Sequence, residues 1–465
     1  MRNGTGLESY PTTPQAAANY YNTPMTTTIA SLPVVQNQPD IDYELLLDCV
    51  HCGLCTSACP TYVETGNEAD SPRGRIYLMR GVIDGRVPLD NTVKGHLDLC
   101  LNCRACETAC PSGVQYGKLI EPFRLHMVKT GQAEQHLPWL QRQVLEYIFP
   151  SRRRNRLALM PARWMQYLGV DRLLERIGFM SLLPRSLRQM QSMLPRLKPH
   201  YGSFPEALPA EGTRRARVGL FLGCVADAIY PETNLATAQV LQKNGCEVVI
   251  PRRQVCCGAL HYHSGQEEPA AKFAAQNLTA FGFTTEEWTS LDAVVVNIAG
   301  CGAMLKDYGH LLHHSHADAG KAFAGKVKDV SEFLMKLGPL RPEHPLKLRA
   351  TYHDACHLCH AQQIRKPPRQ LLEMIPGLEL IPLAESEICC GAAGSYNLTQ
   401  PEMAERLGDR KIGHILETKA EAVFTGNAGC LLQIARHLKK QAPNLWVAHP
   451  IDALWASYNG HDPRE

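Results

Sequence analysis

Two cysteine runs of identical spacing constrain this chain more than any other part of its sequence. Each run has the form C-x2-C-x2-C-x3-C-P. The first contains Cys49, Cys52, Cys55 and Cys59, and the second contains Cys100, Cys103, Cys106 and Cys110. Three thiolates at this spacing can wrap one metal cluster, and the fourth, one residue further on and followed by proline, points away from it. The two runs therefore predict two metal clusters.

The spacing resembles that of bacterial two-cluster ferredoxins, in which the fourth cysteine of each run binds the cluster of the other run. One predicted [4Fe–4S] cluster is accordingly held by Cys49, Cys52, Cys55 and Cys110. The other is held by Cys100, Cys103, Cys106 and Cys59. Zinc is the alternative, but it prefers paired C-x2-C knuckles that close on four N or S ligands. Two iron–sulfur clusters fit the spacing better.

Composition narrows the class of protein. A chain of 465 residues is long enough for about three domains of roughly 150 residues. Its 18 cysteines fall largely into ligand spacings, which argues against a disulfide scaffold and for a reducing compartment. The net charge of +3 gives no reason to expect nucleic acid binding. Without an apolar run of membrane-spanning length or a signal-peptide core, we expect a cytoplasmic protein, with peripheral contact to the inner membrane face left open.

The N-terminal third divides into a leader and a cluster domain. Residues 1–40 are rich in Thr, Pro, Asn and Gln and are predicted to be disordered. Residues 41–130 are predicted to form a helical ferredoxin domain, because Ser71 followed by Pro72 is a good helix start between the two cysteine runs. Arg73 and Arg75 on this helix either lie near the negatively charged clusters or belong to a solvated face.

A basic connector is predicted over residues 131–215, with fourteen Lys and Arg against six Asp and Glu. Apolar residues recur among the arginines at helical spacing, and the prolines at 150, 161, 184 and 195 are expected to divide the segment into short helices. Such a segment can lie on an anionic membrane, dock an acidic partner subunit or simply be solvated. The charge pattern does not discriminate among these three interpretations.

Strand-like and helix-like segments alternate twice in the rest of the chain, over residues 216–340 and 341–465. Strands are expected near 216–224, 246–250, 293–298 and 327–330, and again near 348–353, 378–382, 422–425 and 445–448. This alternation favours parallel sheets covered by helices, and its repetition predicts two pseudo-symmetric α/β halves. The predicted fold class is thus mixed, with a helical (α+β) cluster domain followed by two α/β cysteine-rich repeats.

Each repeat carries four cysteines at nearly equal spacing, two of them in a C-C-G triplet. The first repeat has Cys224, Cys256, Cys257 and Cys301, and the second has Cys356, Cys389, Cys390 and Cys430. They follow predicted strands, whose carboxyl ends converge where open α/β sheets bind ligands. One or two further iron–sulfur clusters, redox-active thiols and buried structural thiols all remain open here. The role of Cys359 stays open as well.

Histidines accompany these cysteines. We consider two interpretations, hydrogen-bond donors to sulfur or ordinary loop residues, for His261, His263, His353, His357 and His360. A second group is expected on a surface loop and comprises His310, His313, His314 and His316.

The order of these motifs resembles the iron–sulfur subunits of two-electron dehydrogenases that carry cysteine-rich (CCG) domains. It is most similar to the glycolate oxidase iron–sulfur subunit family, over about residues 40–458. Related layouts occur in iron–sulfur proteins for lactate, glycerol 3-phosphate and heterodisulfide chemistry. In heterodisulfide reductase the motif ends in a further C-x-x-C and holds a noncubane cluster, whereas this chain has only Cys301 and Cys430 at those places. That departure argues against a noncubane cluster.

The resemblance implies an electron-transfer subunit without a catalytic residue of its own. No G-x-G-x-x-G follows a predicted strand, so neither FAD nor NAD is expected on this chain. The implied partners are an FAD-containing dehydrogenase subunit that oxidises glycolate to glyoxylate and a quinone or other membrane acceptor. The rival functions within redox chemistry are those of an iron–sulfur subunit in a complex that acts on lactate, glycerol 3-phosphate or a heterodisulfide. A module in which clusters or zinc only stabilise the fold is the rival from another class.

Overall fold

The computed structural model describes residues 41–131, 139, 143–178, 191, 194–197, 204–284, 290–462 and 464. The predicted leader over residues 1–40 lies outside the described residues.

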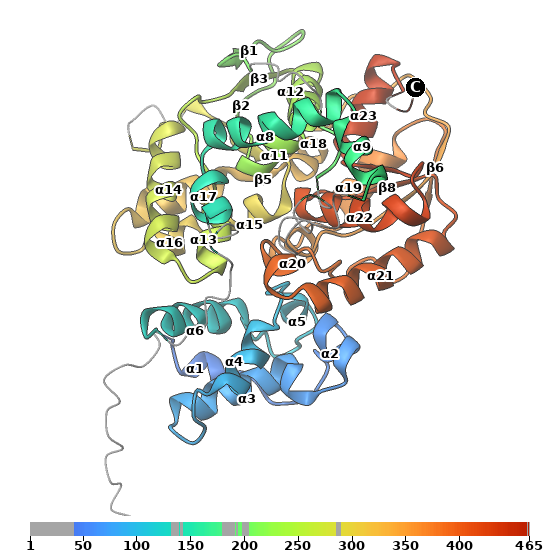
Figure 1. Cartoon of the computed structure of the whole chain (residues 1–465). Coiled ribbons are helices and arrows are strands. Elements are labelled where there is room, and N and C mark those ends of the chain that lie inside the picture. The colour runs from blue at the N-terminus through green and yellow to red at the C-terminus, as the bar shows by residue number, and fades with distance from the viewer. Residues whose placement is uncertain are drawn as a thin grey trace, which may run out of the picture. The chain divides into compact units, whose positions relative to one another are not determined.

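Short helices surround the two cysteine runs (Figure 1). They are α1 (Glu44–Leu47), α2 (Pro60–Thr65), η1 (Glu68–Asp70), α3 (Pro72–Ile83), α4 (Asn91–Asp98), α5 (Ala105–Thr108) and α6 (Gly117–Lys129). The predicted start of α3 is confirmed, because the Ser71 side chain accepts a hydrogen bond from the amide of Gly74 and Pro72 occupies the first turn. Met79, Leu119 and Phe123 form the buried centre of this domain.

The basic connector contains a π-helix η2 (Val144–Ile148), then α8 (Arg152–Tyr167) and α9 (Val170–Arg176). Our expectation that Pro161 would end a helix is wrong, since α8 continues through it. Proline removes only one backbone donor, and α8 is held from outside by buried contacts. Arg152 and Arg156 both bind the fully buried carboxylate of Asp227, and Asn155 donates to the carbonyl of Cys224.

The first repeat contains a five-stranded sheet in the order β1-β3-β2-β4-β5. Its strands are β1 (Ala207–Leu208), β2 (Ala216–Phe221), β3 (Cys246–Val249), β4 (Ala293–Val296) and β5 (Val327–Asp329). Its helices are α11 (Cys224–Ile229), α12 (Pro231–Lys243), α13 (Ala259–His263), α14 (Glu267–Ala280), α15 (Ala299–Lys306), α16 (Tyr308–Leu311), α17 (Ala317–Lys326) and α18 (Val330–Leu337). The sequence pattern missed β1, a two-residue antiparallel edge strand.

The second repeat contains a four-stranded parallel sheet in the order β7-β6-β8-β9. Its strands are β6 (Leu348–Tyr352), β7 (Leu378–Ile381), β8 (Ala422–Phe424) and β9 (Trp446–Ala448). Its helical segments are η5 (His357–Ala361), α19 (Lys366–Glu373), α20 (Tyr396–Thr399), α21 (Pro401–Glu417), α22 (Ala428–Gln441) and α23 (Pro450–Asn459). Because β3-β2-β4-β5 has the same parallel order in the first repeat, the predicted internal repeat is confirmed.

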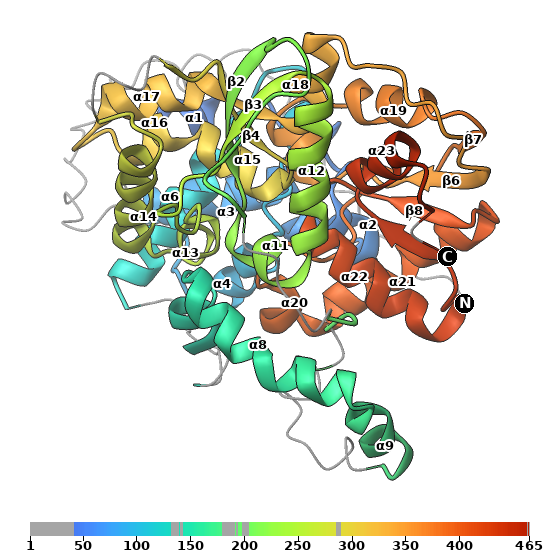
Figure 2. The same ribbon diagram turned by 90° about the horizontal axis from the view of Figure 1, so that it is seen from above.

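The two repeats pack in a pseudo-symmetric way. Helix α12 of the first contacts α23 of the second, and the corresponding helices α19 and α18 contact each other (Figure 2). One hydrophobic core runs through both sheets and includes Val248, Leu334, Leu371 and Leu454. The repeats therefore share their core, and the carboxyl ends of the two sets of strands are held in a constant relation.

Candidate metal centres

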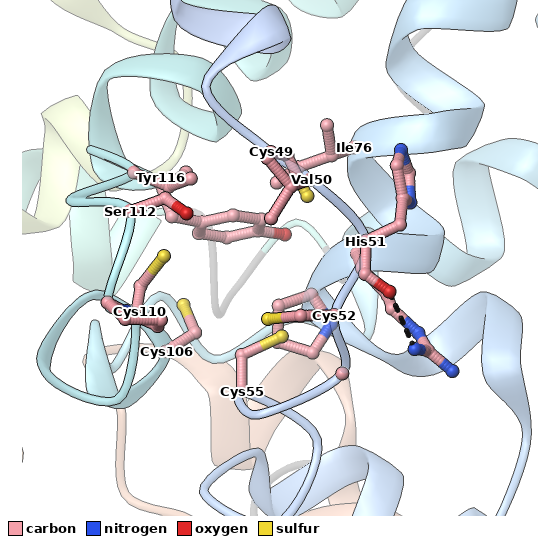
Figure 3. A pocket seen from close by; sticks show the side chains of 15 residues that line it. Cys49, Val50, His51, Cys52, Cys55, Ile76, Cys106, Cys110, Ser112 and Tyr116 are labelled. Carbon is pink, nitrogen blue, oxygen red and sulfur yellow. Dashed lines mark hydrogen bonds between the residues drawn. The ribbon is translucent and has the colours of Figure 1, made fainter.

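The first cysteine pocket lies between the two cysteine runs. Figure 3 shows the thiols of Cys49, Cys52, Cys55, Cys106 and Cys110 around this pocket. Cys52 is exposed, and Val50 and Leu54 beside it are 68% and 59% exposed. The pocket therefore lies close to the protein surface. The three early cysteines of the first run and the last cysteine of the second meet here, as the predicted first ligand set requires.

The second cysteine pocket is lined by Cys59, Cys100, Cys103 and Cys106. Cys59, Cys100 and Cys103 are each less than one-tenth exposed, and burial raises the pKa of Cys103 and of Cys106 well above the usual thiol range. Uncharged thiols are favoured in such a place unless a metal binds the thiolates. Cys106 lines both pockets, so the two pockets are neighbours.

The backbone takes the same path through both runs. His51 and Asn102, each two residues after the first cysteine, have φ of 56° and 52°. Gly53 and Arg104, each four residues after it, have φ of 86° and 59°. Left-handed backbone at a non-glycine residue costs energy, so its recurrence at matching positions indicates a required turn. The same turn around the same thiol spacing fits one type of cluster in both pockets.

Two arginines of α3 supply positive charge to the pockets. Arg73 lines the first pocket and donates to the carbonyl oxygen of His51 at 3.0 Å (Figure 3). Arg75 is 1% exposed, and its guanidinium lies 3.9 Å from the sulfur of Cys59 and 3.7 Å from a carboxylate oxygen of Asp70. Burial opposes the charge of Arg75, but Cys100, Tyr116, Cys59 and Asp70 outweigh burial and raise its pKa. A buried cation of this kind suits a negatively charged cluster.

Side chains of the second repeat pack against Cys103 of the second pocket. Cys103 lies in one buried cluster of side chains with Cys356, Cys389 and Tyr396. The Tyr396 hydroxyl donates to the carbonyl of Leu99 at 2.8 Å, which ties α20 to the second cysteine run. Sequence reasoning missed this contact, because no pattern links residues so far apart in the chain.

Polar contacts join the same run to the first repeat. Glu121 on α6 lies 3.2 Å from His263 and 3.4 Å from Arg104, and Arg104 also reaches Asp307 at 3.4 Å. Burial favours the uncharged form of Glu121, but His263 and Arg104 outweigh burial and lower its pKa to about 2. Arg104 belongs to the second cysteine run, but its partners Glu121 and Asp307 lie 17 and 203 residues further along the chain.

The four thiols of the first repeat meet after strands β2, β3 and β4. Cys224 donates to Cys256 at 3.4 Å, and Cys257 donates to Cys301 at 3.5 Å. The amide of Gly258 lies 3.5 Å from the Cys256 sulfur, at a φ of 91° that favours glycine. The predicted convergence of these thiols at the strand ends is confirmed.

The four thiols of the second repeat meet in the same way after strands β6, β7 and β8. Cys356, Cys389 and Cys430 are each 5% exposed or less, and Cys390 is fully buried. The hydrogen bond from Cys356, together with one from Cys390, lowers the pKa of Cys389, and the partner thiols Cys356 and Cys390 have raised pKa values. The two adjacent cysteines also hydrogen-bond each other, Cys256 with Cys257 and Cys389 with Cys390, although neighbouring side chains usually diverge.

The accompanying histidines have different surroundings. His357 lies 3.4 Å from the Cys356 sulfur, and burial lowers its pKa to about 3. His353 lies close to Cys390 and Cys430, whereas His360 contacts Thr108 at 3.1 Å. His263 pairs with Glu121, as described above. His261 is buried beside Phe273.

The second histidine group and Cys359 are the remaining residues that the sequence singled out. The surface location of the second histidine group is confirmed, with His310 at the surface of α16 and His313, His314 and His316 in the exposed segment that follows. The Cys359 thiol is fully buried in η5 and lies 3.8 Å from the carbonyl oxygen of Cys356. None of the helices among the described residues combines the length and apolar character needed to cross a membrane.

Comparison with known proteins accounts for this architecture. A family model described as "4Fe-4S dicluster domain" matches residues 45–114, and one described as "Cysteine-rich domain" matches residues 218–306 and 350–435. Residues 136–194 match a model described as "Glycolate oxidase iron-sulfur subunit, linker region". These matches confirm the predicted order of an iron–sulfur dicluster domain followed by two cysteine-rich repeats.

Curated relatives extend over most of the chain. The probable glycolate oxidase iron–sulfur subunit of Bacillus subtilis (strain 168) is 38% identical over 89% of this chain and 94% of its own length. The glycolate oxidase iron–sulfur subunit of Escherichia coli (strain K12) is 35% identical over 84% of this chain and 90% of its own. Lactate utilization protein A of Geobacillus kaustophilus (strain HTA426) is 34% identical over 51% of this chain and 98% of its own. The chain therefore belongs to the glycolate oxidase iron–sulfur subunit family.

Proposed function

We propose that this chain is the electron-transfer subunit of a flavin-dependent 2-hydroxy-acid dehydrogenase, with glycolate as the substrate. The observation that carries the proposal is the succession of cysteine sites within the molecule. The two ferredoxin pockets share Cys106, so the two predicted clusters are neighbours. Clusters in neighbouring pockets can pass electrons from one to the next, whereas clusters that only stabilise a fold do not need to be neighbours.

The ligands are assigned by pocket. Cys49, Cys52, Cys55 and Cys110 hold one [4Fe–4S] cluster, and Cys100, Cys103, Cys106 and Cys59 hold the other. The bound clusters supply one-electron redox chemistry, with potentials set by charge, hydrogen bonds and exposure. This chain's residues hold the thiolates in place, exclude water from the second pocket and place the Arg75 cation beside Cys59.

The exposed end of the first pocket is the place where electrons enter or leave. Cys52 is exposed there, and two apolar side chains, Val50 and Leu54, flank it. Apolar groups around a redox centre allow another protein to approach closely and exclude water. We assign the FAD-containing partner to this surface, because glycolate oxidation needs a flavin and the sequence of this chain offers no dinucleotide-binding fingerprint.

A second surface faces outward on α8. Arg152, Arg156 and Arg163 are directed into the protein, where they bind Asp227 and the carbonyl of Ala228. The outward residues are half or more exposed and comprise Leu157, Met160, Trp164, Tyr167 and Leu168. Exposed arginines, Arg153 and Arg172, flank them. Apolar and aromatic residues with a basic rim are typical of helices that lie on anionic membranes, where a quinone acceptor is found.

A substrate screen of the assembled complex tests this function. The chain is co-expressed with its flavoprotein partner, and the complex is screened with glycolate, lactate, glycerol 3-phosphate and other hydroxy acids. We expect dye reduction with glycolate by the complex and none by the chain alone. A preference for lactate would show that glycolate is the wrong substrate. Flavin-dependent turnover by the lone chain would refute the electron-transfer role.

Membrane binding is tested with vesicles of phosphatidylglycerol and of phosphatidylcholine. We expect the chain to sediment with the anionic vesicles only, and Trp164→Glu with Leu168→Glu to abolish binding. Equal behaviour of the variant and the natural chain, or binding to an acidic partner protein instead of vesicles, would refute the membrane assignment.

A further inference from the structure

The second repeat differs from the first at a position beside its thiols. His353 stands three residues before Cys356, and Phe221 stands three residues before Cys224 in the first repeat. Both residues follow the start of the matched cysteine-rich segments by the same number of positions. His353 is fully buried. A polar ring in place of a phenyl ring therefore needs partners in the interior.

Only one side of the His353 ring has an ordinary partner. Nδ1 lies 3.0 Å from the carbonyl oxygen of Ser386, and that acceptor requires Nδ1 to carry the proton. The tautomer leaves Nε2 with a lone pair, and Nε2 has no partner among the described residues other than the thiols beside it. A ring held by a backbone carbonyl through one nitrogen, with the other nitrogen free, is the usual arrangement of a metal-binding histidine.

The thiols beside this ring are close enough to share one ion with it. Ligand atoms of His353, Cys390 and Cys430 all lie within 4.8 Å of one another, and all three residues are buried. Ligands of one tetrahedral zinc ion, at about 2.0–2.3 Å from the metal, lie roughly 3.5–3.8 Å apart. Ligands of a cubane cluster bind different irons and lie farther apart than this. The spacing thus favours a single ion.

The local charge agrees with thiolate ligands. Lys411 of α21 is 2% exposed, and its ammonium donates to the carbonyl of Glu385. Lys411 lies near enough to Cys390 and Cys389 to interact with them electrostatically. In the first repeat the corresponding residue is the neutral Asn277 on α14. Asn277 stands 21 residues after Cys256, and Lys411 stands 22 residues after Cys389. The second repeat thus carries a buried cation near its thiols at a place where the first repeat carries a neutral side chain.

We propose that the second repeat holds a single zinc-type metal ion bound by His353, Cys390 and Cys430. Imidazole and thiolate together select zinc among the common divalent ions. The first repeat has no such group of three within the parts of the chain that the structure describes. The second repeat thereby differs from both ferredoxin sites in metal, ligand set and nuclearity.

The full chain is purified anaerobically, incubated with equimolar zinc chloride, desalted and assayed for zinc and iron. We expect about one zinc per chain, and X-ray absorption at the zinc edge should show sulfur at about 2.3 Å together with nitrogen at about 2.0–2.1 Å. His353→Phe and Cys430→Ala should each lose the zinc. Phe is the residue that the first repeat carries at this position, and the visible absorption of the ferredoxin clusters reports that the variants fold.

Matched controls come from the first repeat. His261 is also buried, has an unpartnered ring nitrogen and lies near the Cys256 thiol, and Cys301 corresponds to Cys430. His261→Phe and Cys301→Ala should keep the zinc. Zinc retained by His353→Phe, an all-sulfur shell, failure to retain added zinc, or extra iron with sulfide at this site would each overturn the proposal.

Discussion

Cys103 and Cys389 lie in one buried cluster of side chains, although one belongs to the ferredoxin domain and the other to the second cysteine-rich repeat. Tyr396 and Met403 pack in the same cluster and exclude water from the junction. The contact places the second repeat directly against the second ferredoxin pocket. It also means that changes on α20 and α21 will be felt at the second pocket.

Replacement of Cys59 tests the exchange of fourth ligands. Cys59→Ser should damage the cluster of Cys100, Cys103 and Cys106, because Cys59 lines their pocket. The matched variant Cys110→Ser should instead damage the cluster in the first pocket. Electron paramagnetic resonance of the reduced protein and iron content measure the losses. The reverse pattern of damage would show that each run binds its own cluster.

Replacement of Arg75 tests the charge beside the second pocket. Reduction adds negative charge to a cluster, so a nearby cation favours the reduced form and raises the potential. Arg75→Met should lower the potential of the second cluster and, because it removes one of the two ion-pair partners of the buried Asp70 and leaves His96, destabilise the fold by about 1–3 kcal/mol. Redox titration and urea unfolding measure the two effects. Arg75→Lys keeps the charge if Arg75→Met fails to fold.

Arg73 provides the control for this experiment. It is 31% exposed and lies beside the first pocket. Arg73→Met should produce a smaller change, confined to the first cluster, since solvent screens its charge. Equal shifts of one cluster by both variants would contradict the placement of the two arginines.

Charged substitutions test whether the exposed apolar residues Val50 and Leu54, beside the first pocket, form the docking surface for the flavoprotein. Val50→Glu together with Leu54→Glu should reduce electron transfer from the flavoprotein at least tenfold, because charges must be desolvated when the surfaces meet. Iron content and both reduction potentials should change little, since the two side chains are exposed. Dye-linked turnover of the complex measures the effect. Unchanged turnover would place the partner elsewhere.

Asp329 predicts a defined pH dependence of stability. Burial raises its carboxyl pKa from 3.8 to about 6, and its side chain caps α18 by accepting from the amide of Ser331. A raised carboxyl pKa means that the contribution is complete below pH 3.8 and is lost as the pH rises through about 6. The loss amounts to roughly 2–3 kcal/mol at 1.36 kcal/mol per pKa unit.

Asp329→Asn should therefore be as stable as the natural chain or more stable at pH 7, because asparagine caps a helix equally well and carries no charge. Urea unfolding at pH 5 and pH 8 measures the change. Marked destabilisation by Asp329→Asn at pH 8 would contradict the prediction.

Much of the architecture follows from local sequence alone. The start of α3 depends on Ser71 and Pro72, whose effects act within one turn, and the parallel strands follow from short buried runs such as Ala293–Val296. The cysteine spacing likewise specifies a loop that can wrap a cluster, because ligand spacing is a local geometric property. The family models of the dicluster domain and of the two cysteine-rich repeats agree with the domain order that the motifs predicted.

Tertiary structure alone decided the relations between distant residues. No pattern in the sequence indicates that Asp227 neutralises Arg152 and Arg156, that Cys103 meets Cys389, or that His353 rather than His261 faces two thiols. Pro161 inside α8 is the converse case, in which long-range contacts outweigh a local breaker. The physical reason is the same throughout: propensities and spacings act over a few residues, whereas burial, ion pairing and ligand convergence depend on which elements the complete fold brings together.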